Sequence, residues 1–187
     1  MQWDAIIGVI IGGFLGGGAQ ILHSYYQRFN DMRNLAGSVD GEIEAIARLI
    51  ARRNFVEQFE KLSHTIRAQP GQPIQISDVV AISVEQNYFE VFGSNSARMG
   101  LLGRHARYIA YFYTLAKGAL DTNAELKPLH DVLFKAGQLT GTRDWLADVY
   151  SGLADDIKEL LELSARLGPE LQRLSSLRFV SYIVRGR

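Results

Sequence analysis

Residues 5–22 read AIIGVIIGGFLGGGAQIL and carry no charged side chain. A helix rises about 1.5 Å per residue, so this segment would extend about 27 Å, close to the hydrocarbon thickness of a bilayer. Trp3 precedes the segment and Tyr25 and Tyr26 follow it. Aromatic side chains favour the headgroup layers on either side of a membrane. The segment therefore predicts an N-terminal transmembrane helix.

The alternative interpretation of this segment is a cleaved signal peptide, with small residues at positions 17–19 as the cleavage site. Signal peptides begin with a basic region, whereas residues 1–4 contain no Lys or Arg, so a retained anchor is favoured. Arg28 and Arg33 follow the span, while only Asp4 precedes it. The positive-inside rule therefore predicts that the C-terminal part of the chain lies in the cytoplasm.

The segment contains six glycines, and five of them form two regular rows. The rows consist of Gly8, Gly12 and Gly16 and, about 100° further round the helix, of Gly13 and Gly17. Small residues let helix backbones approach closely in lipid, and Gln20 on the same side would be kept away from the lipid. The pattern predicts a glycine zipper through which copies of the chain self-associate, and two rows suit a ring. The alternative is a simple anchor, because glycine is common in membrane helices.

Composition limits the remaining possibilities. The 187 residues allow one span with its flanks, residues 1–28, and one domain, residues 29–187. Twenty basic and twenty acidic side chains give a net charge of zero, so DNA binding is not expected. The absence of cysteine excludes disulfides, thiol catalysis and cysteine-ligated metals.

Apolar residues at helical spacing predict that the domain is an all-α bundle. Helices are expected at residues 34–69, 88–92, 103–126, 143–167 and 171–184. Interruptions or ends are expected near Gly37 and Gly41, at Gly93, at Lys127-Pro128 and at Gly168-Pro169. Thr142 is the expected N-cap of the fourth helix. Residues 74–84 are expected to form a loop with a short helix.

Arg98 and His105 are the candidate catalytic pair, because an Arg followed by four to six residues and a His resembles the signature of HEPN ribonucleases. In that family of small helical proteins, such side chains from two protomers cleave RNA without a metal. The alternative is that Arg98 anchors a turn and His105 is exposed. Glu60 and His64 share a helix face without further ligands, and His130 is expected at the surface. No metal site, cofactor site or other enzyme motif is predicted.

Residues 95–121 read NSARMGLLGRHARYIAYFYTLAKGALD. This stretch resembles a core found in small, mostly uncharacterised bacterial single-pass membrane proteins. The matching positions are Asn95, Gly100, Leu101, Leu102, Phe112 and Tyr113, with Met99 where leucine is usual. The similarity covers under a quarter of the chain. It implies a location in the bacterial inner membrane and no particular activity.

The overall plan is also similar to the pore-forming membrane accessory of type VI-B CRISPR systems, which has an N-terminal span and a cytosolic helical domain. That resemblance implies a homo-oligomeric ring that forms a pore during antiviral defence. The leading hypothesis is therefore an oligomeric, non-enzymatic membrane protein acting in defence or stress, whose partners are the bilayer and its own copies. The alternatives are a membrane-tethered adaptor that binds a cytosolic protein and a HEPN-like ribonuclease.

Overall fold

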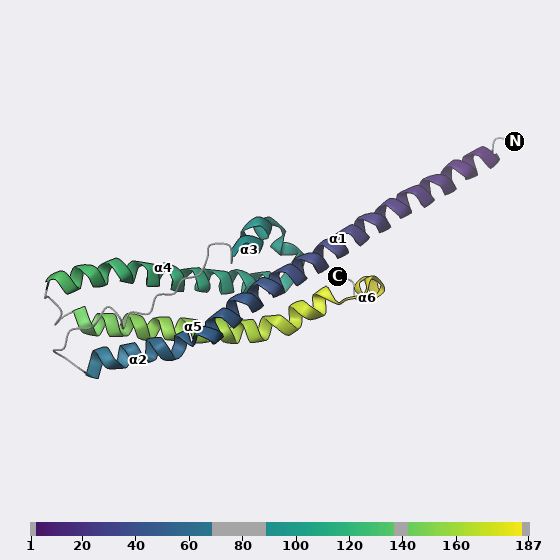
Figure 1. Ribbon diagram of the computed structural model, residues 1–187. Coiled ribbons are helices and arrows are strands. Elements are labelled where there is room, and N and C mark those ends of the chain that lie inside the picture. Colours follow the sequence, from purple (N-terminus) through teal and green to yellow (C-terminus); the bar gives the residue numbers. More distant parts are fainter. Residues whose placement is uncertain (1–2, 69–88, 137–141, 185–187) are drawn as a thin grey trace.

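The computed structural model describes residues 3–68, 89–136 and 142–184, and for residues 3–12, 14, 127–136, 142 and 143 it describes the backbone only. Every element in these ranges is a helix, which confirms the predicted all-α fold (Figure 1). The elements are α1 (Trp3–Arg53), α2 (Phe55–Ala68), α3 (Glu90–Asn95), the 3-10 helix η3 (Ser96–His105), α4 (Ala106–Ala136), α5 (Thr142–Ser175) and α6 (Phe179–Val184). The expected loop at residues 74–84 lies outside the described residues.

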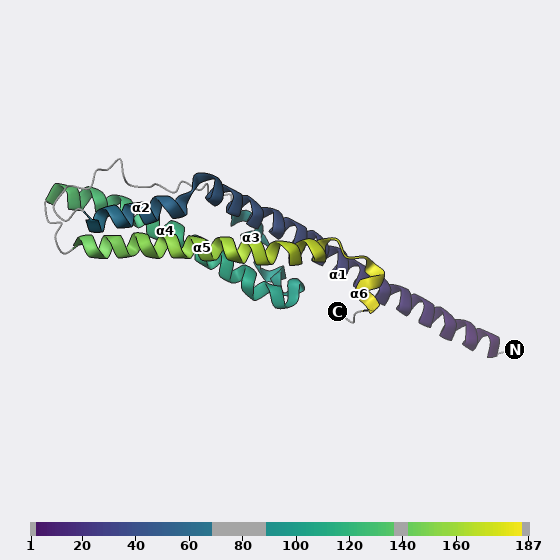
Figure 2. The same ribbon diagram turned by 90° about the horizontal axis from the view of Figure 1, so that it is seen from below.

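The long helices lie side by side in one bundle. Helices α1 and α2 form one long arm, α4 runs in the same direction, and α5 returns antiparallel to both (Figures 1 and 2). Helix α5 packs against α1, α2 and α4 and is therefore the centre of the bundle. The N-terminal half of α1 continues past α6 and projects away from the other helices in both views.

The core is built from the apolar stripes that the spacing predicted. All seven residues of the first stripe are less than 9% exposed, namely Ile43, Ile46, Ile50, Phe55, Phe59, Leu62 and Ile66. On α5, Leu146, Leu153, Ile157 and Leu160 are at most 2% exposed and face these residues. Apolar side chains at every third or fourth position bury one face of each helix, which is what holds the long helices together.

The predicted interruptions near Gly37 and Gly41 are wrong, because α1 passes through both residues without a break. Each glycine disfavours a helix by about 1 kcal/mol, and burial of the neighbouring apolar side chains outweighs this cost. A Cβ at Gly37 would lie 3.7 Å from the Cβ of Ser175, which is an ordinary van der Waals contact, so the packing of α5 does not require glycine here. The break comes instead at Asn54, whose positive φ of 51° suits asparagine better than most residues.

The predicted ends at Lys127-Pro128 and Gly168-Pro169 are also wrong. The backbone of α4 continues to Ala136, and α5 continues to Ser175 with Pro169 inside it. Proline removes one helix hydrogen bond and kinks a helix, but tertiary packing on both sides can keep the helix intact. Packing does so in α5, where Leu167 and Leu171 are 4% and 0% exposed.

The short elements before α4 differ from the prediction in detail. Helix α3 passes through Gly93 instead of ending there, and Asn95 makes no side-chain cap for η3. Gly103 has φ 58° and lies in η3. The helix that was expected to begin at residue 103 is therefore α4, which begins at Ala106. A side chain at Gly103 would strain this left-handed conformation. The turn therefore fixes the direction in which α4 leaves η3.

Candidate functional site

The projecting half of α1 is exposed to solvent along its described length, and the Tyr26 ring at its base contacts Phe179. Every described side chain from residue 15 to residue 28 is exposed, and Phe29 is the first buried one. A Cβ built on Gly13, Gly16 or Gly17 would meet nothing within 4 Å. These three members of the predicted zipper are therefore open, as is Gln20. The side chains at positions 8 and 12 lie outside the described residues.

Large exposed apolar side chains gather at this end of the molecule. Eight of the ten among the described residues lie on the projecting half of α1 or on α6: Leu15, Ile21, Leu22, Tyr25, Tyr26, Val180, Ile183 and Val184. In the described residues, no helix presents a stretch that is long and apolar enough to cross a membrane. Half of the predicted span, residues 5–12 and 14, has side chains outside the described set.

Helix α6 packs against the base of the projecting segment through aromatic side chains. The ring centroid of Phe179 lies 5.1 Å from that of Tyr26 and 5.4 Å from that of Phe29, and Tyr182 lies 5.2 Å from Phe29. Nε of Arg33 donates a hydrogen bond of 2.8 Å to the carbonyl oxygen of Ser175, just before α6. The opposite face of α6 is apolar and open, because Val180 and Val184 are 72% and 80% exposed.

Charge is strongly divided along the bundle, although the chain is neutral overall. We call residues 28–40, 96–108 and 163–184 the basal region, because they meet around the base of the projecting segment. The basal region has eight Lys or Arg and three Asp or Glu. The rest of the described bundle, from residue 41 onward, has seven basic and thirteen acidic side chains whose placement is described. The end that carries the projecting helix is therefore positive and the far end is negative.

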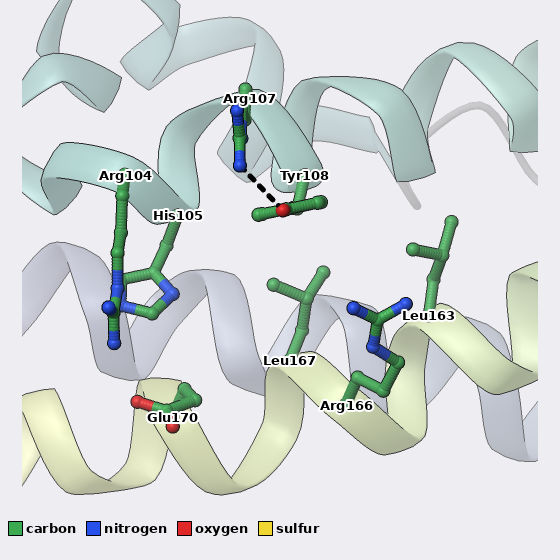
Figure 3. Close-up of a pocket in the computed structure, with 8 residues that line it drawn as sticks. All are labelled: Arg104, His105, Arg107, Tyr108, Leu163, Arg166, Leu167 and Glu170. Carbon is green, nitrogen blue, oxygen red and sulfur yellow. Dashed lines mark hydrogen bonds between the residues drawn. The ribbon is translucent and has the colours of Figure 1, made fainter.

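A cavity of about 420 Å³ opens in the basal region between the start of α4 and α5 (Figure 3). It is lined by Arg104, His105, Arg107, Tyr108, Leu163, Arg166, Leu167 and Glu170. The turn at Gly103 directs the first four residues towards α5. The other four recur at spacings of three and four along α5, so they share one helix face. We call this cavity the arginine pocket.

The arginines of this pocket are held in place without acidic partners. Nη2 of Arg107 donates a 2.6 Å hydrogen bond to the hydroxyl oxygen of Tyr108, and its guanidinium carbon lies 4.5 Å from the centroid of that ring. The guanidinium of Arg166 lies 6.0 Å from the same centroid. In the described chain, neither these two arginines nor Arg104 forms an ion pair. The pocket is therefore a concentration of positive charge.

The candidate catalytic pair is divided between two environments. Nη2 of Arg98 forms a 2.9 Å ion pair with Oδ1 of Asp31 on α1. His105 is 7% exposed and not on the open surface, and it lines the arginine pocket. Arg98 lines neither of the two described cavities that His105 lines. Catalysis by this pair stays a prediction that rests on the sequence pattern alone.

Glu42 is a buried carboxylate that the sequence analysis missed. It is 8% exposed and accepts hydrogen bonds from the backbone N–H groups of Val91 at 2.8 Å and Phe92 at 3.1 Å. It also accepts a hydrogen bond from the hydroxyl of Tyr113, and burial together with this bond raises the pKa of that phenol. Glu42 thus joins α1 to the start of α3 and to α4. Tyr113 belongs to the core motif, which explains one of its positions structurally.

Most of the other motif residues are structural as well. Leu102 and Phe112 are 3% and 0% exposed and belong to the hydrophobic core. Nδ2 of Asn95 donates a 3.0 Å hydrogen bond to the carbonyl oxygen of Val91 and so closes α3. These contacts assign the motif to folding of the α3–α4 corner, not to chemistry.

The other histidine cluster considered from the sequence is not a metal site in the described residues. Oε1 of Glu60 pairs with Nζ of Lys158 at 2.6 Å, and His64 is exposed. The described chain contains no group of three His, Asp or Glu side chains that could hold a metal ion. The side chain of His130 lies outside the described residues.

Comparison with other proteins gives no relative from which function could be transferred. No protein-family model matches the chain, and no curated protein or solved structure is significantly similar to it. Function must therefore be inferred from the projecting helix, the basal region and the arginine pocket.

Proposed function

We propose that this chain is a homo-oligomeric membrane protein whose α1 crosses the bilayer with residues 5–22 and self-associates through its glycine rows. The observation that carries the proposal is that α1 leaves the bundle as one unbroken helix whose described side chains before Phe29 are all exposed. Leu15, Ile21 and Leu22 are 69%, 61% and 54% exposed there. A contiguous exposed apolar surface of this kind is typical of a membrane or protein interface.

The basal region supports an orientation in which the helical bundle lies on the cytoplasmic side of the membrane. Tyr25 and Tyr26 lie where the apolar segment ends, which is the position that aromatic rings take at a headgroup layer. The positive charge of the basal region follows directly, as expected of a cytoplasmic domain beside an anionic leaflet. In this arrangement the open face of α6, with Val180 and Val184, rests on the membrane surface beside the span.

The open glycines support self-association. A second helix can approach the backbone closely at Gly13, Gly16 and Gly17, because nothing in the described chain covers them. The further steps to a conducting ring and to a role in antiviral defence or stress are supported by the sequence resemblance alone.

The test measures the mass of the full chain in detergent and in nanodiscs by size exclusion with light scattering. We expect an oligomer for the wild type and a monomer for the double variant Gly12→Leu/Gly16→Leu, because bulky side chains prevent close packing. The matched control is Leu15→Ile/Leu22→Ile, which keeps volume and hydropathy on the other face and should leave the oligomer intact. An unchanged mass for the glycine variant would rule out the zipper, and a monomeric wild type would favour the tethered adaptor.

The membrane span has its own test. Wild-type protein should stay with the membrane fraction after alkaline carbonate extraction, as integral proteins do. Recovery in the supernatant would contradict the span independently of any result on oligomers.

A further inference from the structure

The arginine pocket is the strongest feature that membrane anchoring and self-association do not explain. Its basic side chains come from two helices that are far apart in sequence, at Arg104 and Arg107 on one side and Arg166 on the other. Its one carboxylate, Glu170, is 3.8 Å from Arg173 and so is shared with an arginine beside the pocket. Figure 3 shows these side chains reaching into the space between η3, α4 and α5.

We infer that the arginine pocket binds a soluble phosphate-bearing small molecule, with its phosphate groups held by the arginines that line the pocket. The guanidinium is planar, permanently charged and matched to phosphate oxygens in a bidentate geometry. A cavity of about 420 Å³ has the size of sites that hold small organic ligands. The walls formed by Leu163 and Leu167 suit a ligand that also has an apolar or aromatic part, as a nucleotide has.

Two exposed arginines of the pocket lie over the same aromatic ring. Arg107 and Arg166 both lie against the ring of Tyr108, so their guanidinium carbons are at most 10.5 Å apart. Each of these exposed guanidiniums keeps hydrogen-bond donors available to an anion, because neither forms an ion pair in the described chain. The hydrogen bond from Arg107 to Tyr108 holds one guanidinium in place, which lowers the entropic cost of binding. The N-terminus of α4 adds a partial positive charge on the same side.

A free ligand fits the position of the pocket better than a lipid headgroup does. Gly168, beside the pocket on α5, lies next to Asp40, since a Cβ on the glycine would be 3.7 Å from Oδ1 of that residue. Asp40 follows Leu22, the end of the proposed span, by 18 residues, which is about 27 Å along a helix. This distance separates the Gly168 end of the pocket from the headgroups of a flat bilayer, whereas the Arg104 end adjoins the cavity that Tyr182 of α6 lines. The inference does not depend on the membrane span, because every lining residue belongs to the bundle.

The test is isothermal titration of the full chain, in neutral phosphatidylcholine nanodiscs, with sodium pyrophosphate and separately with ATP at constant ionic strength. We expect saturable binding of at least one probe, and at least a tenfold loss of affinity in Arg166→Gln and in Arg107→Gln. The matched control is Arg48→Gln, which removes an exposed arginine that pairs only with Glu44 on α1. This control should bind like the wild type, and circular dichroism should show all three variants folded.

Three results would overturn the inference. The first is no binding of either probe at millimolar concentration. The second is equal affinity in the wild type and in both pocket variants, because the anion would then bind elsewhere. The third is binding that depends on Arg166 but appears only in nanodiscs containing phosphatidylglycerol, which would assign the phosphate to a lipid. None of these outcomes bears on the oligomer or on carbonate extraction.

Discussion

Helix α1 is continuous, but its C-terminal part is packed against the bundle and its N-terminal part is exposed. From Phe29 to Ile50 the helix has a continuous buried stripe that packs mainly against α5. From Gly13 to Arg28 no described side chain is buried, and four glycines between residues 13 and 18 each disfavour a helix by about 1 kcal/mol. An isolated helix of this composition is marginal in water, where packing supplies most helix stability. The described chain provides little packing for this N-terminal part of α1, which we propose is stabilised by the bilayer and by other copies of the chain.

A carboxylate introduced into the packed part of α1 should unfold the bundle, whereas one introduced into the exposed part should prevent membrane insertion. The loss of stability in the packed part is the largest effect that we expect. Val39→Asp puts an unpaired carboxylate at a position that is 0% exposed, so we expect a loss of about 4 kcal/mol or more and an unfolded bundle. Leu15→Asp puts the charge in the proposed span, where it costs about 2.5–3.5 kcal/mol of insertion free energy. Leu15→Asp should therefore leave the bundle folded while the protein is lost from the membrane fraction.

Thermal unfolding by circular dichroism measures the first effect and carbonate extraction measures the second. If Leu15→Asp lowered the unfolding midpoint as much as Val39→Asp does, the two halves of α1 would not be independent. Leu15→Ala, which changes size without charge, controls for truncation of the side chain.

The packed part of α1 also contains Glu42, which is the one buried carboxylate among the described residues of this helix. Removing it should cause the next largest loss in the free energy of unfolding. Glu42→Ala leaves two backbone N–H groups and the Tyr113 hydroxyl without an acceptor, so we expect a loss of about 2–4 kcal/mol. Tyr113→Phe removes one donor from the same carboxylate and should cost about 1 kcal/mol. Chemical denaturation of both single variants and the double variant measures the coupling, which should exceed 0.5 kcal/mol in magnitude for groups in contact. Additive losses would show that the hydrogen bond contributes nothing to stability.

The sequence predicted the helical periodicity well because apolar spacing directly reflects which face of a helix is buried. It failed at Gly37, Gly41 and Pro169, where local propensity favours an end but burial on both sides of the residue decides otherwise. It also missed the break at Asn54, since a left-handed asparagine has no unique sequence signal.

The arginine pocket could not have been predicted from the sequence. Arg107 and Arg166 are 59 positions apart, and only the antiparallel packing of α5 on α4 brings them to one tyrosine ring. The division of charge was hidden for the same reason, because the basal region is assembled from three separate segments. The open face of α6 had a weak signal in the apolar run FVSYIV, but nothing in that run shows that Phe179 and Tyr182 turn inward.

Helix α6 also has one packed face and one exposed face. Changes on its exposed face should have the smallest effect on the free energy of unfolding. Tyr182→Ala removes a ring that packs on Phe29 and should destabilise the bundle by about 2–3 kcal/mol. Val180→Ser/Val184→Ser changes only exposed positions and should stay within about 0.5 kcal/mol of the wild type. The serine pair should instead weaken the contact of α6 with the bilayer.

That contact can be measured cleanly because the chain contains no cysteine, so a single introduced thiol labels one site. A fluorophore on Val184→Cys should be quenched by brominated lipids in nanodiscs, and the Val180→Ser change should reduce the quenching. A label on Asp148→Cys, at the far end of α5, should not be quenched, whereas a label on Leu15→Cys should be quenched strongly. Quenching at position 15 without quenching at position 184 would retain the span and show that α6 stays clear of the membrane, so that its open face must serve a different partner.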